Sequence, residues 1–338
     1  MKTKTEKRVY KVVDIGYGYL KFPKDNEVHK EKAVVARLTD SLNPGESKGI
    51  DVINVDGQDY IVGDAVYKLG RKPMIANEHT GRPQQVAYKV LALYALAKTY
   101  DPADTAITFL TGLPFQNLDE ADVIKEIFTR EHTVILNGRE ITLDIDEALV
   151  SSQGLGTYYS IVRQRGGVIL AKKILIVDLG FHTINYLYVN NGDVDVSLVK
   201  TNRDLGIQNA YTKIADAVNV EFKKNYKFYD VDDLLDNGVP QHDVDKGNIF
   251  VPIIDRPYVQ DALAAYAEDV WSDISDKYND KQREQLDEVI FAGGTAERVK
   301  DHLLASKKLY CSIAEDAQDV QVLGYAELAN KVEQDRNK

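Results

Sequence analysis

Cysteine is nearly missing from this 338-residue chain, which has a single thiol, Cys311. One thiol permits neither an internal disulfide nor a cysteine-based zinc cluster, and such cysteine usage fits the reducing cytoplasm. A run of 18 apolar residues, long enough to cross a membrane, is also missing. The N-terminus is basic, but Asp14 interrupts its apolar stretch too early for a signal peptide. We therefore expect a cytoplasmic protein without membrane contact.

Positive charge is in short supply as well. The chain has 42 Lys and Arg against 53 Asp and Glu, which gives a formal net charge of -11. Because a nucleic-acid footprint needs clustered Lys and Arg, this balance argues against direct binding of DNA or RNA. The proportions of 44% apolar and 28% charged residues are ordinary for a globular protein. The length exceeds what one core usually serves, so we expect two domains.

Several common signatures of catalytic sites are absent from the sequence. It contains no GxxxxGK[ST] P-loop, no GxSxG nucleophile elbow and no HExxH zinc site. The pairs Gly16–Gly18 and Gly154–Gly156 lack the third glycine of a dinucleotide-binding loop. The six histidines are scattered, so each is better explained as a structural or solvated residue than as a metal ligand.

The chain does contain an aspartate–glycine turn near its start, in the segment VVDIGYGYLK at residues 12–21. Gly16 and Gly18 let the backbone turn tightly, and successive N–H groups in such a turn make a nest for anions. Asp14 ends the preceding strand and can hold the hydration shell of Mg²⁺, while Lys21 can neutralise phosphate charge. Taken alone, a plain hairpin with a solvated aspartate would explain this segment equally well.

The same pattern recurs in the segment ILIVDLGFHTINYL at residues 174–187, where four apolar residues run into Asp178, followed by Gly180 and Thr183. An aspartate at the end of a buried strand is costly unless it is paired or lies near a metal. A β-turn aspartate that caps its own backbone is a common alternative. Repetition weakens that alternative, because two such turns could face each other across a cleft and clamp one polyphosphate.

A third glycine segment, VIFAGGTAERV, occupies residues 289–299. Gly293 and Gly294 end a predicted strand, where they would let a flat ring lie against the backbone, and Thr295 can cap the following helix. A simple strand-to-helix turn is the alternative for this segment. Periodicity predicts further elements: a hairpin in 50–68, helices over 83–99, 207–218 and 259–278, and strands over 106–113 and 194–199.

The two aspartate turns open two halves with the same plan of elements. We therefore predict two related α/β domains around a cleft, spanning residues 1–160 and 161–338. Each is expected to carry a small subdomain, at about 30–75 in the first and about 207–258 in the second. No short tandem repeat occurs, which excludes a solenoid.

The three segments, in this order, resemble the phosphate-1, phosphate-2 and adenosine motifs of the actin superfamily, which includes actin, sugar kinases and large ATP-dependent chaperones. The first loop matches the actin form Asp-x-Gly-x-Gly-x-x-Lys, and the second matches Asp-x-Gly-x-x-Thr. Within the superfamily, the length and the segments YIVGDAV, TGLPFQ, SSQGLGTYYS and VLGY look most like plasmid-segregation actins of the ParM (StbA) type. This resemblance covers most of the chain and implies the actin-like, or ribonuclease H-like, fold.

The resemblance also implies roles for individual residues. The expected contacts to ATP or ADP are Gly16, Tyr17, Gly18, Tyr19, Lys21, Gly180, Phe181, His182, Thr183, Gly293, Gly294 and Thr295, with Gly206, Asn209 and Lys213 as candidate ribose contacts. Asp14 and Asp178 are expected to hold Mg²⁺ through water. Gln153 stands where the family has a Glu or Gln that positions the attacking water. A neutral amide orients water but is a poor base, so hydrolysis would rely on Mg²⁺ and positioning.

The sequence departs from the family pattern in both phosphate loops. Tyr17 stands where actin has a small hydroxyl residue, so backbone contacts must replace a side-chain bond to phosphate. Phe181 and His182 are bulkier than the usual glycine-rich second loop.

We expect an ATPase that binds Mg-ATP, or also GTP, in the interdomain cleft and forms nucleotide-dependent filaments. The resemblance further implies plasmid DNA segregation through a ParR-type adaptor bound to a centromere-like site, and the net charge agrees with a need for a basic adaptor. Three alternatives stay open. They are a bacterial or phage cytoskeletal filament for another cargo, a small-molecule kinase of the same superfamily, which needs a carboxylate base, and a chaperone-like member, disfavoured because no substrate-binding domain follows residue 338.

Overall fold

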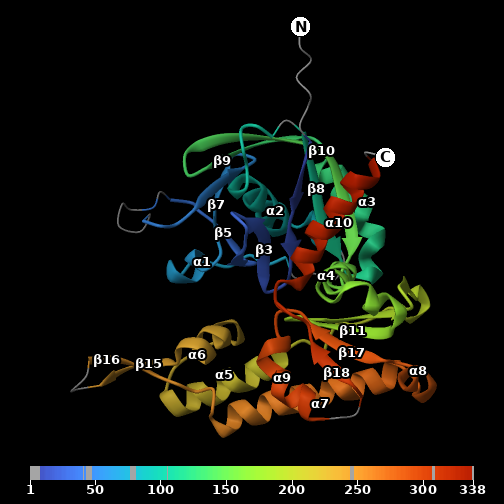
Figure 1. The fold of residues 1–338 in the computed structure, drawn as a ribbon. Coiled ribbons are helices and arrows are strands. Elements are labelled where there is room, and N and C mark those ends of the chain that lie inside the picture. Colours follow the sequence, from blue (N-terminus) through green and yellow to red (C-terminus); the bar gives the residue numbers. More distant parts are fainter. Residues whose placement is uncertain are drawn as a thin grey trace.

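The computed structural model describes residues 8–40, 42, 48–76, 81–104, 106–243, 247–306 and 309–336. It has two α/β halves, drawn one above the other in Figure 1 with the N-terminal half uppermost. The strands of the N-terminal half are β1 (Arg8–Val12), β2 (Asp14–Ile15), β3 (Tyr19–Lys24), β4 (Glu27–Lys32), β5 (Val35–Arg37), β6 (Val52–Val55), β7 (Gln58–Val62), β8 (Ala106–Leu113), β9 (Glu131–Leu136) and β10 (Arg139–Ser152). Its main helices are α1 (Ala65–Lys68), α2 (Val86–Lys98) and α3 (Ala121–Phe128).

The chain passes to the C-terminal half through α4 (Leu155–Arg165) and a 3-10 helix, η3 (Gly166–Ala171). The strands that follow are β11 (Lys173–Leu179), β12 (Ile184–Asn190), β13 (Asp193–Val194), β14 (Lys200–Asn202), β15 (Val239–Asp243), β16 (Gly247–Val251), β17 (Glu288–Ala292) and β18 (Cys311–Ile313). The helices are η4 (Val196–Leu198), α5 (Gln208–Phe222), η5 (Phe228–Asp230), α6 (Val231–Asn237), α7 (Pro257–Lys277), α8 (Asp280–Glu284), α9 (Ala296–Ala305) and α10 (Val320–Arg336).

The central sheets of the two halves share one strand order. In the C-terminal half the order is β13-β12-β11-β17-β18, with β14 also on β12. In the N-terminal half β4-β3-β2 forms one sheet and β1-β8-β10 begins another. Only Val13 separates β1 from β2, and its N–H donates to the carbonyl of Leu110 on β8 at 2.9 Å. The two sheets thus read as β4-β3-β2/β1-β8-β10, which confirms the prediction of two related α/β halves.

The parallel strands at the middle of each sheet are apolar because helices cover both of their faces. Every residue of β8 and of β17 is buried, and α2 is buried along nearly its whole length. In the C-terminal half the Trp271 ring of α7 packs edge-on against Phe291 of β17, with ring centroids 5.3 Å apart. These two hydrophobic cores hold the central strands β8 and β17 in place and so fix the positions of their carboxyl ends.

Helices α4 and α10 cross at the junction of the halves. A Cβ on Gly324 of α10 would overlap the backbone of Gly156 on α4, so only glycine permits this approach. Although α10 ends the chain, its Val322 and Tyr325 pack with Val12 and Leu110 of the N-terminal half. The C-terminal segment therefore adds a helix to the first half of the fold, and the division at residue 160 stays a proposal.

Some local predictions hold and one is wrong. The hairpin around Asp56 is confirmed as β6–β7, with Val55 opposite Gln58. The strand expected over 194–199 is wrong, because the Asp195 carboxylate accepts hydrogen bonds from the N–H and hydroxyl of Ser197 and turns the chain into η4.

Parts of both predicted small subdomains, residues 41, 43–47 and 244–246, lie outside the described residues. Within the described part of the chain, no helix is long and apolar enough to cross a lipid bilayer.

The close approach of α10 to α4 at Gly324 gives a prediction about stability. Helix propensity alone favours Ala over Gly by about 1 kcal/mol, but a Cβ on Gly324 would lie 1.6 Å from the Gly156 carbonyl oxygen, an overlap that opposes it by about 2–3 kcal/mol. We expect Gly324→Ala to lower the free energy of unfolding by about 1–2 kcal/mol in a urea titration. The matched control is Gly167→Ala, since a Cβ on Gly167 meets no atom within 4 Å. A Gly324→Ala protein as stable as wild type would contradict the close crossing.

Candidate functional site

Two glycine turns, one in each half, have the same backbone geometry. The N–H of Gly16 donates to the carbonyl of Tyr19 at 2.9 Å, and the N–H of Gly180 donates to the carbonyl of Thr183 at 2.9 Å. A Cβ on Gly16 would lie 2.8 Å from the first carbonyl oxygen, and one on Gly180 would lie 2.7 Å from the second. Glycine is therefore required at equivalent positions of both turns, and each turn is a compact loop whose backbone can approach a ligand.

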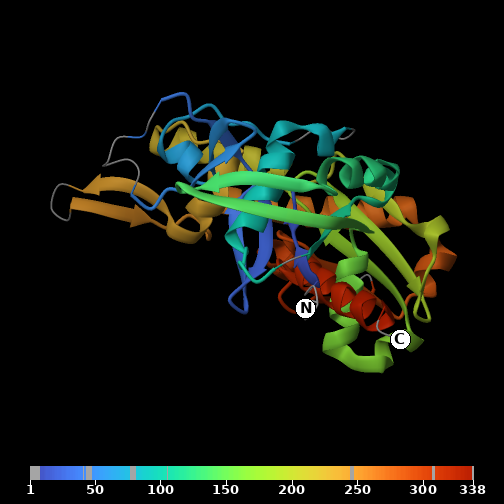
Figure 2. The same ribbon diagram turned by 90° about the horizontal axis from the view of Figure 1, so that it is seen from above.

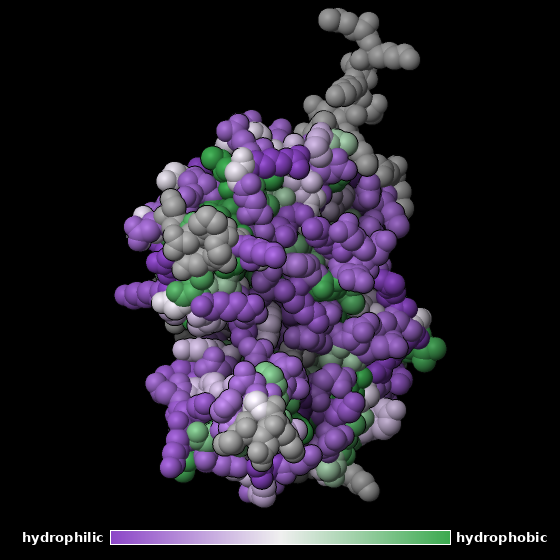
Figure 3. Space-filling model, turned by 90° about the vertical axis from the view of Figure 1, so that its left-hand side faces the viewer, coloured by the Kyte–Doolittle hydropathy of each residue, from purple (hydrophilic) through white to green (hydrophobic). Residues whose placement is uncertain are grey.

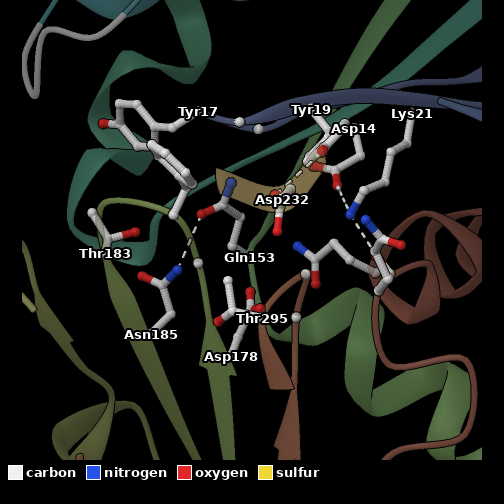
Figure 4. A pocket seen from close by; sticks show the side chains of 18 residues that line it. Asp14, Tyr17, Tyr19, Lys21, Gln153, Asp178, Thr183, Asn185, Asp232 and Thr295 are labelled. Carbon is white, nitrogen blue, oxygen red and sulfur yellow. Dashed lines mark hydrogen bonds and ion pairs between the residues drawn. The ribbon is translucent and has the colours of Figure 1, made fainter. Parts of the chain in front are cut away.

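The turns bring two carboxylates, buried Asp14 and partly exposed Asp178, into one cavity (Figure 4). Burial raises the pKa of Asp14, and burial together with the Asp14 charge raises the pKa of Asp178 to about 6. Lys21 Nζ lies 3.9 Å from an Asp14 oxygen and also donates to the carbonyl of Gln318. The charges of Lys21 and Arg82 lower the pKa of Asp14, and that of Lys21 lowers the pKa of Asp178, but burial outweighs both effects.

This donor set fits Mg²⁺. Mg²⁺ prefers oxygen ligands, keeps several waters and is often held by one or two carboxylates plus substrate phosphates. Among the described residues, no group of three or more His, Cys, Asp or Glu side chains could hold a metal ion alone. Water and phosphate oxygens would therefore complete the coordination that Asp14 and Asp178 begin.

The third glycine segment packs directly against the second turn. Gly293 has φ of 92°, and a Cβ there would collide with the Asp178 carboxylate and the Leu179 backbone. Thr295 stands at the N-cap position of α9 as predicted, but its hydroxyl donates to the Leu179 carbonyl at 2.9 Å and makes no capping hydrogen bond, which corrects the expected capping role. A side-chain bond to β11 has replaced the cap because β17 and β11 are adjacent parallel strands.

Gln153 lies between the halves, directly after β10, and its amide has a defined orientation. Its Oε1 accepts a hydrogen bond from Nδ2 of Asn185 at 3.2 Å (Figure 4). Asn185 also hydrogen-bonds the Asp178 carboxylate, which can only accept hydrogen bonds, so the Asn185 amide must be the donor. The Oδ1 of Asn185 in turn accepts a hydrogen bond from the Thr201 hydroxyl at 3.0 Å. These partners turn the Asn185 NH2 towards Gln153, so Gln153 presents its own NH2 to the cavity.

Most of the residues singled out by sequence meet in this cavity, which encloses about 710 Å³ including its opening to solvent. From the sequence prediction it contains Asp14, Gly16, Tyr17, Gly18, Tyr19, Lys21, Gln153, Asp178, Gly180, Phe181, Thr183, Gly293, Gly294 and Thr295 (Figure 4). The roles of these residues stay predictions.

Four predicted contacts lie outside the lining. His182 lines the neighbouring cavity, where it packs edge-on against the Tyr17 ring at 5.2 Å. Gly206 packs under the second turn, since a Cβ there would collide with the Phe181 carbonyl and with His182. Asn209 and Lys213 are exposed on α5.

The lining also contains residues that sequence reasoning missed, namely Asn185, Asp232, Gln318 and Gln321. Asn185 could have been found, because hairpin pairing places it directly opposite Asp178. Asp232 on α6 belongs to no motif, and its Oδ2 accepts from the Tyr19 hydroxyl at 3.3 Å across the cleft. Gln321 comes from α10, where its Oε1 accepts from the N–H of Gly154 at 3.1 Å.

Tyr17, the residue that departs from the actin pattern, is held by Arg82. The guanidinium carbon lies 4.2 Å from the centre of the Tyr17 ring, and its Nη2 donates to the Gly16 carbonyl at 2.7 Å. A cation over an aromatic face stabilises such an arrangement by about 0.5–2 kcal/mol. Arg82 therefore stabilises the first turn through both Gly16 and Tyr17. The Tyr17 ring stands where actin has a small hydroxyl residue.

Family models match both halves of the chain. The model "Actin like proteins N terminal domain" matches residues 13–156, and "Archaeal actin homologue MreB-like, C-terminal" matches residues 176–305. No curated protein matches the sequence significantly.

Solved structures resemble the whole chain. Ta0583, an archaeal actin homolog, superposes with a TM-score of 0.78 at 19% identity, covering 96% of this chain and 99% of that one. The complex of this homolog with ADP superposes with a TM-score of 0.76 at 18% identity, covering 96% of this chain and 99% of that one. The structure of a 15-stranded ParM filament from Clostridium botulinum superposes with a TM-score of 0.75 at 19% identity, covering 95% of this chain and 99% of that one. These likenesses confirm the predicted actin-like fold.

The paired carboxylates give a binding prediction. We expect Asp178→Asn to weaken Mg-ATP binding about tenfold to a hundredfold in a calorimetric titration, because a charged ligand of the ion is lost. Removing one of two repelling buried charges should leave the ligand-free protein at least as stable as wild type. Unchanged Mg-ATP affinity would remove Asp178 from the site, and a less stable protein would contradict the repulsion.

Proposed function

Because the chain belongs to the actin-like proteins, we propose that it is an ATPase that binds Mg-ATP between its two halves. The observation that carries this proposal is the meeting of two equivalent Asp-x-Gly turns, one from each half, beside the Gly293–Gly294 loop. Backbone N–H groups of both turns would bind phosphate oxygens, and Lys21 would neutralise part of their charge. The glycines of the third loop leave room for the nucleoside. The ADP complex of the archaeal actin homolog agrees with this assignment.

The residues of the cavity suit hydrolysis that depends on positioning. Bound Mg²⁺ would neutralise the charge that develops on the phosphates. Gln153, oriented by Asn185, offers N–H donors to the terminal phosphate or to a water beside it. Preorganised donors of this kind stabilise developing negative charge without reorienting during the reaction. A neutral amide is a poor base, so we expect slow turnover, in keeping with an ATPase that times a conformational cycle.

We further propose that the protein polymerises in a nucleotide-dependent way. A ligand that contacts both turns favours the closed arrangement of the halves, and phosphate release removes part of that bias. The ParM filament among the similar structures supports assembly as the outcome. The proposed cargo is plasmid DNA, bound through a ParR-type basic adaptor, because a net charge of -11 disfavours direct DNA contact.

Sedimentation tests the proposal. Purified protein is incubated with Mg-ATP, Mg-GTP, Mg-ADP or a non-hydrolysable ATP analogue, and pelleted protein and released phosphate are measured together. We expect pelleting with Mg-ATP, more durable pelleting with the analogue and little with Mg-ADP. Protein that stays in the supernatant with every nucleotide over a wide concentration range would sink the filament proposal. A burst of ADP that depends on an added sugar or acetate would favour a small-molecule kinase instead.

Gln153 gives a prediction that separates hydrolysis from binding. In Gln153→Ala, the cavity loses the oriented amide but keeps both carboxylates, Lys21 and the glycine turns. We expect Mg-ATP affinity within about twofold of wild type, phosphate release slower by about tenfold to a hundredfold, and longer-lived polymers. Phosphate release is followed under single-turnover conditions. Wild-type release from this variant would remove Gln153 from the reaction.

A further inference from the structure

Three side chains from neighbouring strands of the C-terminal half form a row at the cavity. Antiparallel pairing places Asp178 of β11 directly opposite Asn185 of β12, and Asn185 directly opposite Thr201 of β14. Residues that face each other across paired strands project from the same side of a sheet, with Cβ atoms about 4.5–5.5 Å apart. Asp178 and Asn185 line the cavity, and Thr201 is not among its lining residues. Thr201 can therefore act on the cavity only through Asn185.

The Asn185 amide has a different partner on each of its two polar atoms. Its Nδ2 donates to Oε1 of Gln153 at 3.2 Å (Figure 4), and its Oδ1 accepts from the Thr201 hydroxyl at 3.0 Å. Asn185 is buried, so a carbonyl oxygen left there without a donor would be costly. The Thr201 hydroxyl therefore holds the Asn185 amide with its NH2 turned towards Gln153.

The opposite face of β14 is anchored to helix α7. Asn202 follows Thr201 and projects from the other side of the sheet, where its Nδ2 donates to the Asp273 carboxylate of α7 at 2.8 Å. The same carboxylate accepts from the Tyr186 hydroxyl of β12 and pairs with Lys277 at 3.3 Å. Figure 1 draws α7 beneath the strands of this sheet, and Figure 2, seen from above, draws it behind them. The position of Thr201 is thus fixed by the packing of α7 on the sheet.

We propose that Thr201 is a positioning residue for ATP hydrolysis. Through Asn185 it keeps the Gln153 amide in the orientation that presents its NH2 to the terminal phosphate or to a water beside it. Donors that are held in place before the reaction stabilise developing charge without reorienting, so loss of the hydroxyl should slow the chemical step. The inference rests on the proposed ATPase activity and adds to it a residue that belongs to none of the glycine segments.

Substitutions of Thr201 test this role. Thr201→Val removes the hydroxyl and keeps the branched side chain. We expect phosphate release under single-turnover conditions to be slower by about threefold to tenfold, because the Gln153 amide is no longer held in one orientation. Mg-ATP affinity, measured by calorimetry, should stay within about twofold of wild type, since both carboxylates and both glycine turns are unchanged. Thr201→Ser keeps the hydroxyl and should release phosphate within about twofold of the wild-type rate.

A double variant separates positioning from a general effect on the fold. If Thr201 acts through the Gln153 amide, adding Thr201→Val to Gln153→Ala should change the rate of phosphate release by less than about twofold, because the group that Thr201 positions is already gone. A structural role would slow release by the same factor in both backgrounds. Equal slowing in wild type and in Gln153→Ala would therefore overturn the proposal.

The matched control is Thr142→Val, the same change in a strand of the other half. Thr142 on β10 is exposed and faces Thr133 across the β9–β10 pair. Figure 3 shows a surface on which hydrophobic residues already stand in small groups among hydrophilic ones, so one more exposed valine is ordinary. We expect this control to bind Mg-ATP and release phosphate like wild type.

The outcomes separate the role of Thr201 from the proposed function. If wild type releases no phosphate from Mg-ATP, the proposed function fails and the role of Thr201 fails with it. If wild type releases phosphate and Thr201→Val releases it equally fast, or loses Mg-ATP affinity by the same factor, the role of Thr201 is overturned and the proposed function stands. If Thr201→Val unfolds at a lower temperature than the Thr142→Val control, Thr201→Ala takes its place, because it removes the hydroxyl without putting a methyl group there, and the same outcomes apply.

Discussion

The burial of Asp14 and Asp178 at one cavity is the constraint on which the rest of the site depends. Two carboxylates from different halves line one cavity, where the Lys21 charge lowers the pKa of both but does not offset the effect of their burial. Buried charge of one sign is costly unless a counter-charge is bound, so the ligand-free arrangement is poised to take up a cation with its phosphates. We therefore expect a bound ligand to couple the halves, so that their relative position follows what the cavity holds.

The close contact of α4 and α10 at Gly156 and Gly324 connects the cavity to the junction of the halves. Gln153 precedes α4, and Gln321 of α10 accepts a hydrogen bond from the N–H of Gly154 at the start of α4. The helices that join the halves thus begin within the lining of the cavity. We expect a change at the phosphates to reach the junction through this contact between the Gly154 backbone and the Gln321 side chain.

Sequence reasoning predicted the parts of the site that depend on short-range geometry. Asp14, Gly16, Asp178 and Gly180 could be found because a strand followed by a tight glycine turn has a local signature. Asp232 could not be found, since α6 reaches the cavity only through tertiary packing. The N-terminal packing of α10 was missed for the same reason. The capping bond predicted for Thr295 is wrong because its hydroxyl donates to the neighbouring strand β11, and strand pairing is not visible in a local pattern.

The most direct test of the shared site is the Mg²⁺ dependence of ATP binding in a double variant, Asp14→Asn/Asp178→Asn, measured by calorimetry with Mg²⁺ and with a chelator. If both carboxylates hold one ion, Mg²⁺ should strengthen ATP binding in wild type but barely in the double variant. The losses of the single variants should also fail to add, because they remove the same ion. An equal Mg²⁺ effect in wild type and double variant would contradict the account.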